Sequence, residues 1–183
     1  MIKLFLILFY NILRWGWKKI LHGSRYMVHP IQRISIMCTL KLFNKATLVI
    51  GKNCEFAFGC CIESHGIGRL EIGKGVYMNR NCMISCQEKV IIGNDCIFGP
   101  GVKIFDNNHQ FSCENGVSQR LNTAPIIIGE KCWIASNVVI LKGVTIGDNC
   151  LIGAGCTISE NVPSGMMVKQ EAILSITPIR KPK

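Results

Sequence analysis

The sequence lacks the signals that would assign it to several common classes. It has eleven cysteines but no Cys-x-x-Cys pair of the kind that holds zinc, which disfavours metal binding by these cysteines. The apolar run at residues 4–10 is too short for a transmembrane helix, which needs about 20 apolar residues. No small-x-small cleavage site follows it, which disfavours a signal peptide. The net charge of +10 comes with no aromatic and basic nucleic-acid-binding motif, so we expect no nucleic-acid partner.

What the sequence does have is an apolar residue at every sixth position over most of its length. The period is unbroken in the second half of the chain, where it places Ile128, Ile134, Ile140, Ile146, Ile152 and Ile158. A small or β-branched residue follows four positions after each of them. A six-residue period matches neither a helix nor an alternating strand. It is typical of a parallel β-helix, in which each hexad is a short strand and a corner.

Most of the cysteines fit this repeat. Seven of them occupy the small position of a hexad, namely Cys54, Cys60, Cys82, Cys96, Cys132, Cys150 and Cys156. We interpret them as small buried side chains rather than as a disulfide scaffold. Disulfides persist mainly in oxidising compartments, so stacked free thiols favour a cytoplasmic location.

The chain divides into three parts. Residues 1–21 are predicted to form an amphipathic helix, residues 22–163 a β-helix domain, and residues 164–183 a C-terminal tail. A polar segment at residues 110–125, which contains an Asn-Gly turn signal, interrupts the repeat and is predicted to be an extruded loop. A loop of this length inside a compact domain is usually functional.

Two interpretations of residues 1–21 are open. In this segment the apolar run is followed by two tryptophans and three basic residues, namely Trp15, Trp17, Arg14, Lys18 and Lys19. This composition fits a helix that lies in a membrane interface, with tryptophan at the headgroup level and basic side chains against anionic lipid. It fits equally a helix that packs on the base of the prism or on a neighbouring subunit.

The chain resembles the hexapeptide-repeat acyltransferases, and most of all their branch of maltose, galactoside and polysaccharide O-acetyltransferases. Three motifs carry the resemblance over about residues 50–168. They are the corner Asn79-Arg80-Asn81-Cys82, the segment from Ile104 to His109 just before the extruded loop, and the stretch from Pro125 to Gly155. The last of these is similar to the terminal coils that bind the pantetheine arm of the cofactor.

This resemblance implies an all-β fold, a left-handed parallel β-helix, in a homotrimer with active sites between subunits. It implies acetyl-CoA as the co-substrate and no metal. The cofactor would lie beside Trp133, Ala135, Ser136, Lys142, Ala154 and Ser159. The acceptor would bind near Asn79, Gln87 and His65, with Gln87 about where galactoside-type relatives carry an acceptor-binding aspartate.

His109 is the candidate general base among four histidines. Acyl transfer from a thioester to a hydroxyl needs a base for the hydroxyl proton and hydrogen-bond donors for the oxyanion. A free imidazole, with a pKa of about 6.5, suits that task at neutral pH, and the matched segment gives the role to His109. Asn79 would bind the hydroxyl or the oxyanion. Asp106 either orients the His109 ring or is a corner residue that caps its own turn.

The implied activity is transfer of an acetyl group from acetyl-CoA to a sugar hydroxyl, in the biosynthesis of a cell-surface polysaccharide such as capsule or lipopolysaccharide. The basic, tryptophan-bearing N-terminus favours a membrane-associated sugar and a peripheral position on the inner face of the cell membrane. The alternatives are a small acceptor (a free sugar, serine or a streptogramin-like antibiotic) and a non-catalytic β-helix interaction protein.

Overall fold

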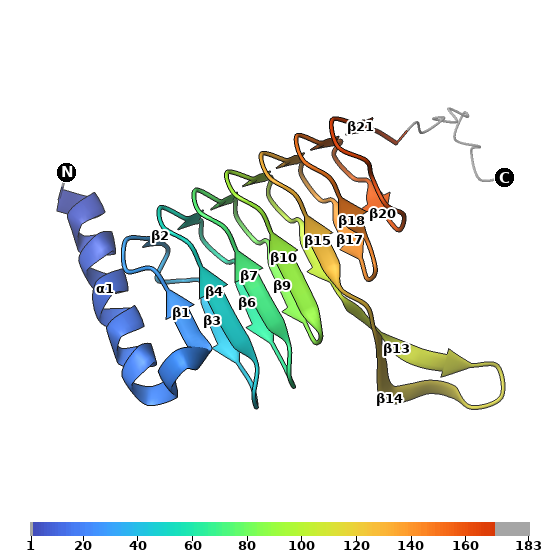
Figure 1. Ribbon diagram of the computed structural model, residues 1–183, viewed down its shortest axis with the longest axis horizontal. Coiled ribbons are helices and arrows are strands. Elements are labelled where there is room, and N and C mark those ends of the chain that lie inside the picture. The colour runs from blue at the N-terminus through green and yellow to red at the C-terminus, as the bar shows by residue number, and fades with distance from the viewer. Residues whose placement is uncertain (1, 171–183) are drawn as a thin grey trace, which may run out of the picture.

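The computed structural model describes residues 2–170, which form a parallel β-helix closed at one end by a helix (Figure 1). The chain winds through three sheets in turn, and each coil adds one short strand to each sheet. Six coils are complete, and the last strand, β21, begins a seventh. The parallel β-helix predicted from the six-residue period is therefore confirmed.

The three sheets form the three faces of a prism. The first face contains β1 (Tyr26–Val28), β4 (Thr47–Ile50), β7 (Arg69–Ile72), β10 (Lys89–Ile92), β15 (Ile126–Ile128) and β18 (Thr145–Ile146). The second face contains β2 (Arg33–Ile34), β5 (Glu55–Phe56), β8 (Tyr77–Met78), β11 (Ile97–Phe98), β16 (Trp133–Ile134), β19 (Leu151–Ile152) and β21 (Met167–Val168). The third face contains β3 (Thr39–Leu42), β6 (Cys61–Ser64), β9 (Met83–Cys86), β12 (Lys103–Phe105), β17 (Val139–Leu141) and β20 (Thr157–Ile158).

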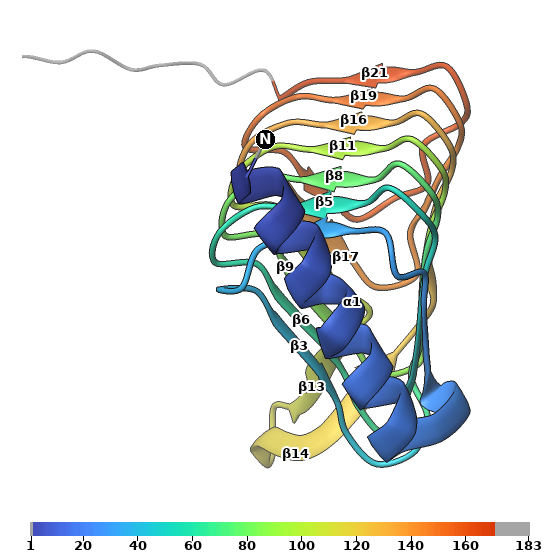
Figure 2. The same cartoon turned by 90° about the vertical axis from the view of Figure 1, so that its left-hand side faces the viewer.

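We number the three corners of a coil in the order in which the chain passes through them. The first corner joins the first face to the second, the second corner joins the second face to the third, and the third corner leads from the third face to the first face of the next coil. The end-on view in Figure 2 shows these faces stacked coil upon coil. Successive strands pair in parallel, so a residue in one coil lies directly over its counterpart in the next.

The apolar residue of each hexad points into the prism. On the second face, Phe98 pairs with Met78 on one side and with Ile134 on the other, and all three side chains are buried. Every member of the isoleucine series from Ile128 to Ile158 is likewise buried. All eleven cysteines lie within the described residues and are free, and burial raises the pKa of Cys54 to about 11. The seven cysteines at the small position of a hexad are all buried, as predicted, whereas Cys113 is exposed.

The helix α1 (Ile2–His22) closes the base of the prism, followed by the short 3-10 helix η1 (Gly23–Arg25) (Figure 2). In the second coil the Phe56 carbonyl accepts a hydrogen bond from Ser35 N in the coil below. The corresponding carbonyl of the first coil, on Ile34, has no coil below it and accepts from Asn11 Nδ2 at 2.9 Å. Trp15 is buried against the same coil. Within residues 2–170, no helix is both long and apolar enough to cross a membrane.

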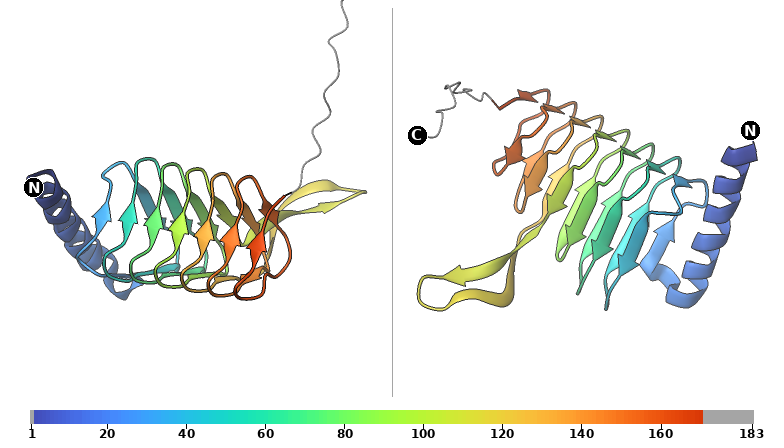
Figure 3. Two further views of the ribbon diagram at one scale, coloured as in Figure 1. Left: turned by 90° about the horizontal axis from the view of Figure 1, so that it is seen from above. Right: turned by 180° about the vertical axis from the view of Figure 1, so that it is seen from behind.

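The segment expected to be an extruded loop is a two-stranded hairpin. It comprises β13 (Asn107–Ser112) and β14 (Gly116–Thr123), which pair in antiparallel fashion, and it projects from the third corner of the fourth coil (Figure 3). The Asn-Gly signal makes its turn, where Gly116 has a φ of 67°. The hairpin thus begins before residue 110, and His109 lies inside its first strand. We refer to residues 107–123 as the arm.

The predicted tail lies mostly outside the described residues. Only residues 164–170 of the range 164–183 are described, and they include β21, which pairs with β19. This pairing extends the second face beyond Pro163, where the hexad pattern in the sequence ends.

Shortening an inward isoleucine should destabilise the fold much more than shortening an outward one. Ile134 is 0% exposed, whereas Ile97 on the paired strand is 50% exposed. We expect Ile134→Ala to lower the free energy of unfolding by about 2–5 kcal/mol, because it removes buried methyl groups and leaves a cavity. Ile97→Ala is the matched control and should cost less than about 1 kcal/mol. If denaturant unfolding shows that both substitutions lower the free energy of unfolding equally, the assignment of inward and outward positions is wrong.

Candidate active site

The arm holds the His109 ring in one orientation. His109 lies on β13 opposite Leu121 of β14, and its side chain is exposed at the root of the arm. The ring Nδ1 lies 3.0 Å from the carbonyl oxygen of Ser118 on β14. A carbonyl can only accept a hydrogen bond, so this contact requires the proton on Nδ1. The neutral ring therefore presents Nε2 as an unprotonated nitrogen, which is the form that a general base needs.

Asp106 caps a corner, but it is the corner of the coil below rather than its own turn. The Asp106 side chain is fully buried, and its carboxylate accepts backbone hydrogen bonds from Gln87, Glu88 and Lys89 at 2.8–3.0 Å. These residues form the third corner of the coil below. The carboxylate is thus directed into the prism, and the orienting partner of the His109 ring is the Ser118 carbonyl instead.

Asp106 and Asn107 also fix the root of the arm. The Asp106 carbonyl accepts from Ala124 N at 3.0 Å, where the arm returns to the prism. The side-chain amide of Asn107 donates to the Ser85 carbonyl at 3.1 Å and to the Asp106 carboxylate at 3.0 Å. The Asp106 and Asn107 side chains therefore tie the start of the arm to the coil below, and a backbone hydrogen bond joins the end of the arm to its start.

The thiol nearest to this root is not a nucleophile. Cys86 ends β9 and is fully buried. Burial and the neighbouring Asp106 carboxylate raise the pKa of Cys86 to about 12, so the thiol stays protonated at neutral pH. Since only the thiolate is strongly nucleophilic, Cys86 is not a candidate for covalent catalysis beside the root of the arm.

Asn79 lies at a different corner from His109. It follows β8 at the second corner, is partly buried, and its Oδ1 accepts from Arg80 N at 2.8 Å. This bond occupies the amide oxygen and directs the amide nitrogen elsewhere as a donor. Above Asn79 the same corner is built by Gly99 and then by Ala135 and Ser136, because Asn79 N donates to Phe98 O and Gly99 N donates to Ile134 O.

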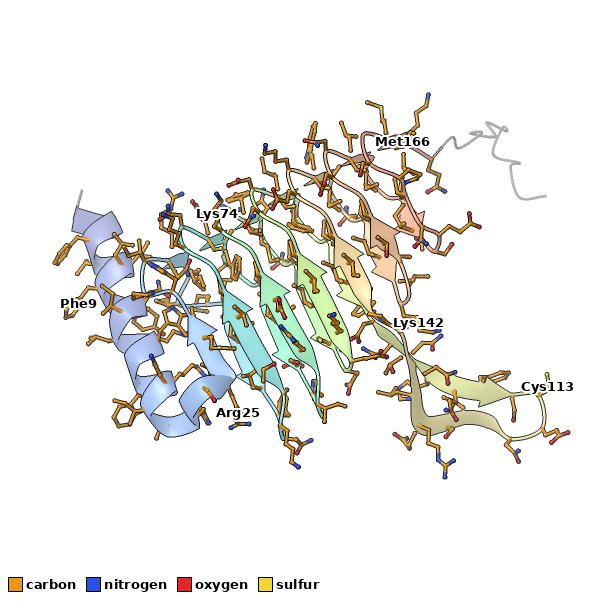
Figure 4. The ribbon with its side chains drawn as sticks, viewed as in Figure 1. Phe9, Arg25, Lys74, Cys113, Lys142 and Met166 are labelled. Atoms are coloured by element: carbon orange, nitrogen blue, oxygen red, sulfur yellow. The ribbon has the colours of Figure 1, made fainter. Side chains whose placement is uncertain are left out.

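The residues predicted to bind cofactor and acceptor divide between these two corners. Ala135, Ser136 and Ala154 stack with Asn79 at the second corner, and Trp133 is an exposed residue of the adjoining second face. At the third corner, with His109, lie His65, Gln87, Lys142 and Ser159. Figure 4 shows Lys142 beside the root of the arm. The prediction therefore identified two columns of residues, not one cluster.

One chain does not bring His109 and Asn79 together. The third face lies between their corners, and the four residue steps from Val102 to Asp106 span about 13 Å at 3.3 Å per step. No substrate hydroxyl could contact both side chains across that distance. The two columns can form one site only if the third corner of one copy meets the second corner of another.

His65 stands two coils below the arm in a local cluster. Its ring stacks on Phe43 with centroids 4.4 Å apart, and its Nε2 lies 3.6 Å from a carboxylate oxygen of Glu63. Lys41 approaches the same carboxylate at 4.0 Å. The cluster gives the third corner an aromatic and charged surface below His109. Across the part of the chain that is described, no group of three or more His, Cys, Asp or Glu side chains is placed to hold a metal ion.

Comparison with known proteins bears on the fold and the repeat. The family model described as bacterial transferase hexapeptide (six repeats) matches residues 125–160. The chain is 36% identical over 98 residues to galactoside O-acetyltransferase of Escherichia coli K12, which covers 54% of this chain and 48% of that protein. These matches support the resemblance to the hexapeptide-repeat acyltransferases. The matched region spans about half the length of the E. coli relative.

Two further proteins resemble the chain over more of its length. WbbJ of E. coli K12, provisionally named a lipopolysaccharide biosynthesis O-acetyl transferase, is 25% identical over 134 residues, with 68% of each protein covered. The crystal structure of AntD, an N-acyltransferase from Bacillus cereus in complex with dTDP and 3-hydroxybutyryl-CoA, has a TM-score of 0.69 at 15% identity. That likeness covers 84% of this chain and 81% of AntD, and it supports the fold.

Removing the side chain of Asp106 should loosen the root of the arm. In Asp106→Ala, the three backbone N–H groups of the corner below would lose their acceptor inside the prism. We expect the free energy of unfolding to fall by at least about 1–3 kcal/mol, the usual cost of a buried unsatisfied group. The control is Glu114→Ala at the exposed tip of the arm, which should be neutral. If Asp106→Ala and Glu114→Ala unfold at the same urea concentration, the Asp106 carboxylate is not a structural cap.

Proposed function

We propose that the protein transfers an acetyl group from acetyl-CoA to a hydroxyl of a sugar. The observation that carries this proposal is the contact between His109 Nδ1 and the Ser118 carbonyl, which leaves Nε2 free to accept a proton. Support also comes from the relatives, whose names describe O-acetyl transfer to galactosides and, provisionally, to lipopolysaccharide.

His109 acts as the general base in a direct transfer. Its Nε2 takes the proton of the acceptor hydroxyl as that oxygen attacks the thioester carbonyl. The tetrahedral intermediate then expels the CoA sulfur, which receives the proton from the imidazolium, so the enzyme returns to its starting state. No acyl-enzyme is needed because the thioester is already activated, and the buried, protonated Cys86 offers no nucleophile.

The active site forms between copies of the chain. The arm and third corner of one copy supply His109, and the second corner of a neighbour supplies Asn79. A homotrimer of parallel prisms provides three such junctions with closed symmetry. The pantetheine arm would lie along the stacked corner of Ala135, Ser136 and Ala154, where backbone groups pair with its amides, and Asn79 Nδ2 would donate to the acceptor or to the oxyanion.

The acceptor is a sugar of a cell-surface polysaccharide. The provisional lipopolysaccharide name of WbbJ supports this class. His65 and Gln87, in the column below His109, would contact the sugar beyond the reacting hydroxyl. The free cysteines throughout the prism agree with a reducing, cytoplasmic compartment.

Loss of the His109 imidazole should abolish most turnover without loss of cofactor binding. We expect His109→Ala to lower kcat with acetyl-CoA and a sugar acceptor by about 10² to 10⁴, the usual contribution of a general base. Its affinity for acetyl-CoA, measured by calorimetry, should stay within twofold or so of the unmodified protein. His29→Ala, at an exposed corner of the first coil, is the matched control. Near-normal turnover of His109→Ala would refute the assignment.

A further inference from the structure

The helix α1, which caps the prism, exposes a large apolar face to solvent. Asn11, Trp15 and Lys18 face the first coil, where Asn11 and Trp15 are buried and Lys18 Nζ lies 3.5 Å from the Leu40 carbonyl. The opposite face is made of exposed large apolar side chains: Phe5, Leu6, Phe9, Tyr10, Ile12, Leu13, Trp17, Ile20 and Leu21. At 3.6 residues per turn these residues fill about half of the helix circumference, and none of the helix side chains described on this face, from residue 5 on, is charged.

This face is directed away from the rest of the molecule. Figure 4 shows Phe9 pointing outward from the base, on the side opposite to the coils. Trp17 is 63% exposed and Ile20 77% exposed, whereas Trp15, two residues before Trp17, is 4% exposed. The cap therefore needs only one side of α1. The apolar residues of the other side do not contribute to closing the prism, and their exposure is the mark of a binding surface.

The charge of the chain is concentrated at the same end. Residues 1–54 contain nine lysines and arginines and no acidic residue, whereas the remainder contains twelve basic and eleven acidic residues. Nine of the ten net positive charges therefore belong to α1, the first coil and the beginning of the second coil. Lys19, Lys45 and Lys52 are exposed there. A second copy would present the same positive field, so the complementary partner is anionic.

We propose that α1 docks the protein on an anionic lipid bilayer. The helix lies in the membrane plane with Phe9, Leu13 and Trp17 among the acyl chains near the headgroups, and the basic residues around it contact lipid phosphates. Arg14 and Lys18 stay with the prism, where they donate to the carbonyls of Cys38 and Leu40. The coils then stack away from the bilayer, because α1 crosses the base of the prism (Figure 2).

This docking surface is independent of the acetyl-transfer proposal and is tested with the full-length protein. The probes are vesicles of phosphatidylcholine alone and vesicles of phosphatidylcholine mixed with phosphatidylglycerol, and the readout is the fraction of protein that floats with them. The unmodified protein should float with the mixed vesicles, much less with the neutral ones, and less at high salt because exposed charges are screened.

The decisive variant is Phe9→Gln combined with Leu13→Gln and Trp17→Gln. We expect it to partition at least about tenfold more weakly, with an unchanged thermal midpoint because none of the three side chains closes the prism. The matched control replaces Ile67, Met166 and Met167 with Gln. These residues are also exposed and apolar but lie away from α1, so this variant should float normally.

Several results would overturn the proposal. Failure of the unmodified protein to float with the mixed vesicles would do so, as would flotation of the α1 variant at the normal level. Equal recovery with neutral vesicles would contradict an anionic partner. If the α1 variant also changed the sedimentation coefficient in the absence of lipid, the face would instead be a contact between copies of the chain.

Discussion

The backbone pairing between successive coils is the constraint on which the other features depend. Each corner residue is held by the coil above it, as when Gly99 N donates to the Ile134 carbonyl at 2.8 Å and Ala135 N to the Ile152 carbonyl at 2.9 Å. The spacing is so close that a Cβ on Gly99 would lie 2.6 Å from Ser136 N. Residues far apart in the sequence are therefore brought into straight columns, and the two candidate columns follow from this register.

Side chains supply hydrogen-bond partners at two places where this ladder is incomplete. At the base, Asn11 and Arg14 replace the missing coil by donating to the carbonyls of Ile34 and Cys38. At the third corner the arm leaves the ladder, and the buried Asp106 carboxylate restores the lost backbone partners of the corner below. The histidine ring is then oriented within the arm itself. A rigid prism and a tethered hairpin together set the position of the His109 ring.

The fold could be predicted from the sequence because the six-residue period reports burial directly. Ile134 and Cys132 recur where the prism accepts a large and then a small side chain, and both are buried as expected. The position of the arm in the chain could be predicted from the sequence. Its hairpin form could not, because the pairing of His109 with Leu121 joins residues that are distant in the sequence. The Ser118 carbonyl could not be predicted at all, because a backbone acceptor is independent of side-chain identity.

The N-terminal helix shows a second limit of sequence analysis. Trp15 and Trp17 have the same chemistry in the sequence, yet one packs on the first coil and the other faces solvent. The packing interpretation is shown by the structure, and the membrane interpretation persists as a proposal for the opposite face. Both fit one helix, because about 100° of rotation per residue places neighbouring tryptophans on different sides.

The central claim is that one active site uses residues of two chains. Its most direct measurement is the acetyl-transfer rate of mixed oligomers, formed by co-expressing His109→Ala chains with Asn79→Ala chains. Each variant alone should be nearly inactive. In a mixed oligomer the intact His109 of one chain meets the intact Asn79 of the other, so activity should return at a substantial fraction of the normal rate. If mixed oligomers are formed and stay as inactive as either variant alone, the site lies within one chain and the account is wrong.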